Sequence, residues 1–102
     1  MIHVIATITT QPGQRDKVLE LFSANVPAVH AEDGCISYEA VVDVPAFGKP
    51  QTLLGDDTFI VLERWESAQA LKEHGASAHM AEYARKTRPM LAQRVINILE
   101  AC

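Results

Sequence analysis

The stretch IHVIATITT, residues 2–10, decides the fold, because it is apolar on both faces of an extended chain. One face carries Ile2, Val4, Ala6 and Ile8, and the other carries His3, Ile5, Thr7 and Thr9. This alternation of β-branched residues predicts a strand, and apolar groups on both faces indicate that the strand is covered on both sides. The Gln11-Pro12-Gly13 sequence then ends it.

The pattern changes to a helical period from Gln14 onward. The apolar stripe of this helix contains one polar exception, Asn25, and consists otherwise of Val18, Leu21, Phe22, Val26 and Val29. We expect Gly34 to stop the helix and a second strand to cover residues 35–43.

Residues 44–57 are the least regular part of the chain, with two prolines and two glycines. A connection of this length is uncommon unless it covers something. Because it carries Phe47, Leu53 and Leu54, we expect it to lie across the mouth of a pocket or against a partner subunit.

Residues 58–66 predict a third strand, with Phe59, Val61, Glu63 and Trp65 on one face. Ser67 is the expected N-cap of the next helix, Gly75 interrupts that helix, and Ser77 is the expected cap of a second segment. Residues 91–99 predict the last strand, in which Leu91, Val95, Asn97 and Leu99 alternate with Arg94, Ile96 and Ile98.

The predicted order is strand, helix, strand, strand, helix, strand over one domain, residues 1–102. This is the α+β, ferredoxin-like split βαβ pattern with an antiparallel sheet. Its helices cover one sheet face, yet the first and last strands are apolar on both faces. A partner's sheet is the simplest cover for the second face, so we expect a homodimer. The alternative is a monomer with an exposed apolar face.

Composition excludes several function classes. The formal net charge is −4 and there is no basic run, which argues against nucleic acid and against an anionic membrane surface. No apolar run approaches the roughly 20 residues that span a bilayer. The start Met1-Ile2-His3-Val4 does not resemble a signal peptide, so a cytoplasmic location is expected.

No metal site or nucleophile motif is evident. His74 and His79 are five residues apart, which would separate their directions by about 140° on an unbroken helix. Helical zinc pairs prefer a spacing of four, and Gly75 is the one feature that would re-aim these histidines. Cys35 is expected to be a small buried thiol.

A small-molecule pocket is the remaining hypothesis, because several polar groups fall on faces that should point inward. These groups are Asn25, Glu63, Trp65, His74 and Tyr83. Structural roles stay open for each: the amide of Asn25 bonding a carbonyl, Trp65 filling the core, or Glu63 pairing with a surface cation.

Four blocks of the chain, in this order and spacing, resemble the antibiotic biosynthesis monooxygenase family, and within it the quinol monooxygenase group. They are Val4-Ile5-Ala6 with Pro12-Gly13-Gln14, Glu32-Asp33-Gly34-Cys35 with Tyr38, Glu63-Arg64-Trp65-Glu66-Ser67, and His74 with His79. The resemblance implies a dimer whose two sheets form an α+β barrel.

The resemblance also implies oxidation of a quinol, hydroquinone or phenol by O₂ without metal, haem or flavin, because the substrate supplies the electrons. Such a site needs a base and donors for the developing anion. The available bases are His74, His79 and Glu63, and the available substrate-binding donors are Asn25, Trp65 and Tyr83.

Other activities occur in the family. Haem-degrading relatives use an Asn, Trp and His trio, but Thr7 and His74 stand where the Asn and Trp would be, so haem degradation is not expected. An isomerase of a small phosphorylated signalling sugar derivative is an alternative, because such relatives carry a histidine pair like His74 and His79. A non-catalytic binder of small aromatic compounds is a second alternative.

Overall fold

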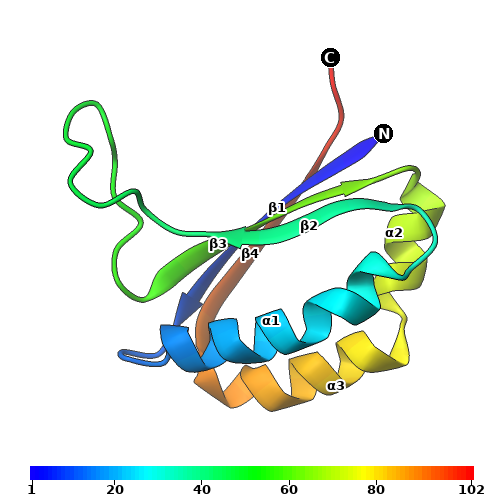
Figure 1. Cartoon of the computed structure of the whole chain (residues 1–102), viewed down its shortest axis with the longest axis horizontal. Helices are drawn as coiled ribbons and strands as arrows, with labels where there is room; N and C mark the ends of the chain where they lie inside the picture. The colour runs from blue at the N-terminus through cyan, green and yellow to red at the C-terminus, as the bar shows by residue number, and fades with distance from the viewer.

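The computed structural model describes residues 1–102 and contains one antiparallel sheet with helices on one of its faces (Figure 1). The strands are β1 (Ile2–Thr10), β2 (Cys35–Val41), β3 (Thr58–Trp65) and β4 (Leu91–Leu99), in the spatial order β2-β3-β1-β4. The helices are α1 (Arg15–His30), α2 (Ala68–Gly75) and α3 (Ala78–Thr87), followed by the 3-10 turn η1 (Arg88–Met90). The predicted α+β ferredoxin-like fold is therefore confirmed.

The second helical region is divided where the sequence predicted a break. Helix α2 ends at Gly75, and Ser67 caps its start by accepting a hydrogen bond from the Ala70 N–H at 3.1 Å. Ser77 occupies the N-cap position of α3, but its hydroxyl donates to the carbonyl of His74 at 2.8 Å instead of capping α3. None of the helices has the length and apolar character needed to cross a bilayer.

The expectation that Gly34 ends α1 was wrong, because the helix already ends at His30. Gly34 lies instead in the turn into β2, with a φ of +84° that favours glycine. A Cβ at this position would lie 2.6 Å from the Cβ of Ala70. Glycine therefore lets the α1–β2 turn approach α2 closely.

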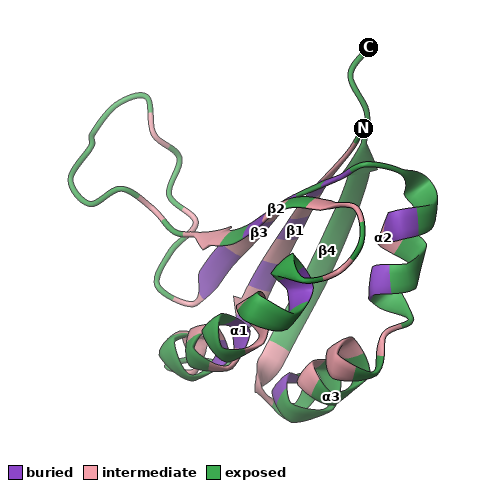
Figure 2. Cartoon of the chain, turned by 45° about the vertical axis from the view of Figure 1, so that its right-hand side comes forward, coloured by how far each residue is buried: buried purple, intermediate pink, exposed green.

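The core lies between the helices and the sheet, where the strands and helices carry their buried residues, purple in Figure 2. The predicted inward face of β3 is buried, and Phe59 and Trp65 are completely inaccessible. On β1, Val4, Ala6 and Ile8 are buried on the same side of the sheet. The buried apolar residues of α1 that pack against them are Val18, Phe22 and Val29.

The opposite face of the sheet has no covering layer within one protomer (Figure 1). Ile5, Ile60 and Leu62 on this face are half-buried, and Val95 on β4 is exposed. The two-sided apolar character of β1 therefore corresponds to one face in the core and one face left open.

Strand β4 presents Arg94, Ile96 and Ile98 to the helix side, because these residues pair with Ile8, Ala6 and Val4 of β1. The pairing shifts between Thr9 and Thr10, and Leu91 also lines the helix side. Placing Leu91 on the face of Val95 was therefore wrong. The helices do not close over β4, and Ile98 is 61% exposed.

The long connection between β2 and β3 extends away from the sheet (Figure 1). Its base is closed by Asp43, whose carboxylate accepts hydrogen bonds from the N–H groups of Leu54 and Gly55. Phe47 and Leu53 are 63% and 67% exposed. No residue of this connection lines the cavity described next, so the expected cover over a pocket mouth is not formed within one protomer.

Candidate active site

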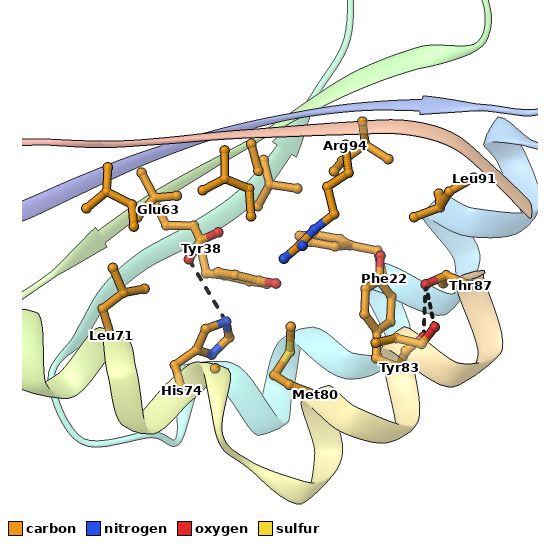
Figure 3. A pocket seen from close by; sticks show the side chains of 18 of the residues that line it. Phe22, Tyr38, Glu63, Leu71, His74, Met80, Tyr83, Thr87, Leu91 and Arg94 are labelled. Carbon is orange, nitrogen blue, oxygen red and sulfur yellow. Dashed lines mark hydrogen bonds and ion pairs between the residues drawn. The ribbon is translucent and has the colours of Figure 1, made fainter.

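A cavity of about 820 Å³ lies between the sheet and the two helices α2 and α3 (Figure 3). Sixteen of its 24 lining residues are hydrophobic, and three aromatic rings, those of Phe22, Tyr38 and Tyr83, contribute to the wall. The cavity exists because β4 continues the sheet beyond the cover of α1. Its size and apolar lining suit a small organic ligand.

His74 is the best-positioned base in this cavity. It is only 5% exposed and sits in the last turn of α2. Its Nδ1 lies 2.7 Å from Oε2 of Glu32, in the turn that Gly34 brings against α2. A carboxylate at Nδ1 favours a proton on that nitrogen, which leaves Nε2 as the acceptor in neutral imidazole.

The second histidine, His79, also approaches Glu32, with 3.4 Å between its Nε2 and the Glu32 Oε2. The two side chains therefore do not diverge as they would on an unbroken helix, because the break after Gly75 redirects α3. His79 does not line the large cavity. Its Nδ1 lies 3.2 Å from Oδ1 of Asn25, and both residues line a separate pocket of about 170 Å³.

Glu63 faces the cavity, whereas Trp65 does not. Nε1 of Trp65 donates a hydrogen bond of 3.0 Å to Oε1 of Glu63, and the same oxygen lies 4.0 Å from Nε2 of His74. Burial raises the pKa of the Glu63 carboxyl, and the hydrogen bond from Trp65 offsets part of this effect. Trp65 is thus a core residue that holds Glu63 in place.

Tyr38 and Tyr83 are the phenol groups of the cavity. The Tyr38 ring stacks on Phe22, with centroids 5.1 Å apart. Burial, and then the charge of Glu63, raise the pKa of Tyr38 above its usual range, and burial raises the pKa of Tyr83 to about 12. Both hydroxyls therefore keep their protons at neutral pH and are available as hydrogen-bond donors.

The structure divides the predicted site residues into three groups. The large cavity is lined by His74, Glu63 and Tyr83. The smaller pocket is lined by His79 and Asn25. Trp65 is buried in the core. No three His, Cys, Asp or Glu side chains are grouped so as to hold a metal ion. Cys35 is half-buried, and burial raises the pKa of its thiol.

Sequence reasoning missed three residues of the site: Glu32, Tyr38 and Arg94. Arg94 had a detectable signal, since it is a charged residue on the same strand face as Ile96 and Ile98. Glu32 belongs to the family-like block Glu32-Asp33-Gly34-Cys35, but nothing in the sequence indicates its contact with His74, which lies 42 positions away.

Comparison with known proteins gives one consistent family. The sequence profile described as "Antibiotic biosynthesis monooxygenase" matches residues 1–86. The chain is 36% identical to the "Probable quinol monooxygenase YgiN" of Escherichia coli K12 over 102 residues, which covers 98% of this chain and 97% of that protein.

Solved structures agree with the sequence comparison. The crystal structure of PA3566 from Pseudomonas aeruginosa has a TM-score of 0.82 and 26% identity, and the match covers 99% of this chain and 93% of that one. The structure of Rv0793 from Mycobacterium tuberculosis has a TM-score of 0.80 and 25% identity, covering 99% and 94%.

Proposed function

The chain belongs to the antibiotic biosynthesis monooxygenase family, and we propose that it is a cofactor-independent monooxygenase that oxidises a small quinol, hydroquinone or phenolic aromatic with O₂. The observation that carries this proposal is the contact between the partly buried Glu32 and the buried His74, which lines the wall of a mostly apolar cavity. A family can host several chemistries, so the residues of the site decide between them.

His74 is the proposed base. Its Nε2 takes the proton of a substrate hydroxyl, and the Glu32 carboxylate stabilises the imidazolium that results. The hydroxyls of Tyr38 and Tyr83 donate hydrogen bonds to the phenolate oxygen as it forms. The apolar wall offers few polar groups to stabilise the ionised substrate, which favours its oxidation.

The ionised substrate then supplies the electrons. It passes one electron to O₂, and the resulting semiquinone and superoxide combine by a C–O bond to give a ring hydroperoxide. Cleavage of the O–O bond, with loss of the proton from the same carbon, releases water and leaves a new carbonyl that tautomerises to the hydroxyquinone. The balance is one hydroquinone and one O₂ giving one hydroxyquinone and one water.

The residues of this chain do two things in that sequence. His74 holds the abstracted proton and is placed to return it to the leaving oxygen, while the phenols hold the anion. No metal, haem or flavin takes part in the proposed reaction. Purified protein should therefore be colourless and contain metal far below one equivalent, by absorption spectroscopy and elemental analysis.

Three measurements on one protein sample separate the candidate functions. O₂ uptake above the uncatalysed rate with a hydroquinone supports the monooxygenase. Exchange of a carbon-bound proton in a phosphorylated sugar derivative, without O₂ uptake, would indicate the isomerase. Tight binding of aromatic compounds with neither reaction would indicate a binding protein. We expect the first result, and either of the others would contradict the proposal.

A further inference from the structure

Arg94 lies at the β4 side of the cavity, facing the helices. It pairs with Ile8 across β1 and β4, on the sheet face that points toward the helices. Its side chain reaches into the cavity, as Figure 3 shows. The flanking residues on this face, Ile96 and Ile98, are apolar and also line the cavity.

Arg94 is exposed, and its guanidinium makes no ion pair or hydrogen bond in the chain, although its charge acts on the carboxyl of Glu63. The ion pairs of the protein join Glu32, Glu63 and Glu82 to other residues, and Arg94 makes neither an ion pair nor a hydrogen bond. Elsewhere, Arg85 pairs with Glu82 and Arg15 donates to the carbonyls of Gly55 and Thr58. Arginine presents a fork of donors that matches a carboxylate, so its position leaves a binding group free toward the ligand.

The charge of the cavity lining is opposite to that of the whole chain. The chain carries a formal net charge of −4. The lining has three cationic side chains, Lys72, Arg88 and Arg94, against the single carboxyl of Glu63. A cleft lined by one sign of charge concentrates ligands of the opposite sign. Aromatic rings in the same wall suit a flat ligand body.

We propose that the substrate is an anionic aromatic, a hydroquinone bearing a carboxylate, which Arg94 binds while the reacting hydroxyl lies at Nε2 of His74. This assignment rests on the proposed function for the identity of the reacting group, but the anion site itself is testable by binding alone. Arg94 acts as a specificity-determining residue, because a ring carboxylate gains a charge-assisted pair with the guanidinium that a neutral hydroquinone cannot form.

The first experiment measures anaerobic binding to the intact protein by calorimetry, with three probes of similar size. These are gentisate, which is a hydroquinone with a ring carboxylate, its neutral methyl ester, and phenyl phosphate. Gentisate should bind at least about tenfold more tightly than the ester, which is the range of one charge-assisted hydrogen-bonded contact. Equal binding of gentisate and ester overturns the proposal. Tighter binding of phenyl phosphate than of gentisate overturns the carboxylate assignment and points to a phosphorylated ligand.

The second experiment uses charge-matched variants. Arg94→Gln should lose the preference for gentisate and keep the ester affinity within about twofold, while Arg94→Lys should keep part of the preference. Arg85→Gln removes the same charge from the exposed side of α3, outside the cavity, and should leave the preference unchanged. Loss of the preference in Arg85→Gln, or its persistence in Arg94→Gln, would contradict the assignment.

Oxygen uptake separates this inference from the proposed function. If gentisate binds selectively through Arg94 but no hydroquinone supports O₂ uptake, the anion site stands and the monooxygenase proposal fails. If neutral hydroquinones are oxidised and the binding preference is absent, the monooxygenase proposal stands and the anion site fails.

Discussion

His74 differs from the other two candidate bases in what surrounds it. It combines a carboxylate at Nδ1 with a second nitrogen directed toward the cavity, so its tautomer and orientation are both set. His79 lies outside the cavity lining, and Glu63 is held by Trp65 on an oxygen that also faces His74. The geometry therefore favours His74 as base and Glu32 as its positioning residue.

Single substitutions of His74, Glu32 and His79 test which of these residues acts as the base. His74→Gln should lower kcat for hydroquinone oxidation by about 10²- to 10⁴-fold, the usual contribution of a general base. Glu32→Gln should lower it less and change the pH–rate profile, because the amide keeps a hydrogen bond but removes the charge. His79→Gln serves as the matched control and should have the smallest effect. Wild-type rates in His74→Gln across the pH range would exclude His74 as the base.

Glu63 makes the stability of the protein depend on pH in a specific direction. Its pKa in the folded protein is raised above 4.5 by burial, so the folded state favours the protonated form. The stability that Glu63 contributes is complete below its unfolded pKa and is lost as the pH rises through the folded pKa. Glu63→Gln should therefore match wild type near pH 4 and unfold at higher urea concentration than wild type above the folded pKa.

The surface residue Glu82 is the control in the same urea titration, because its contribution to stability has the opposite pH dependence. A hydrogen bond from Arg85 lowers the pKa of Glu82, so its contribution is present at neutral pH and is lost on acidification. A Glu63→Gln variant that is less stable than wild type at neutral pH would contradict the burial argument.

At the scale of the elements, the order of strands and helices was predictable because each has a clear periodicity. The alternation in residues 2–10 and the stripe after Gln14 correspond to β1 and α1. The division at Gly75 was also predicted. The register shift that turns Leu91 toward the helices was not, because it depends on the pairing of two distant strands.

The candidate site was less predictable than the elements, because it also depends on contacts between distant segments. His74, Glu63 and Tyr83 were proposed from their faces and line the cavity. The residues that complete it, Glu32, Tyr38 and Arg94, come from a turn, from β2 and from β4. Periodicity in one segment does not report a contact between two segments. Glu32 is the clearest case, since only the packing of its turn on α2 places it at His74.

The turn at Gly34 allows this packing, so substituting it should affect both stability and the site. Gly34→Ala should lose about 1–2 kcal/mol for the left-handed backbone, plus a further cost for overlap with Ala70. Gly13→Ala is the matched control, because Gly13 has a φ of +78° and no atoms within 4 Å of an added Cβ. Chemical denaturation should show the larger loss for Gly34→Ala, and equal losses would mean that close packing on α2 is unimportant.

At the scale of the whole molecule, we predict a homodimer that covers the open sheet face and the exposed connection between β2 and β3. The apolar residues Ile5, Ile60 and Leu62 share that face, and Phe47 and Leu53 project from the connection. Light scattering at micromolar concentration should give twice the mass of the chain. Leu62→Glu should raise the dimer dissociation constant at least about tenfold, because it places a charge in an apolar interface.

A charge on the helix side is the control for this measurement. Ala28→Glu adds the same charge on the exposed surface of α1 and should leave the dimer intact. A wild-type protein that remains monomeric at micromolar concentration would show that the open face has another partner or none.

The proposed reaction transfers one atom of O₂ to the product, and isotope labelling measures this transfer directly. The protein is incubated with a hydroquinone under ¹⁸O₂, and the product is analysed by mass spectrometry beside an enzyme-free sample and the His74→Gln variant. The account predicts a hydroxyquinone that carries one ¹⁸O atom from O₂ per turnover, formed much faster than in either control. Product without ¹⁸O, or formation at the same rate with His74→Gln as with wild type, would contradict it.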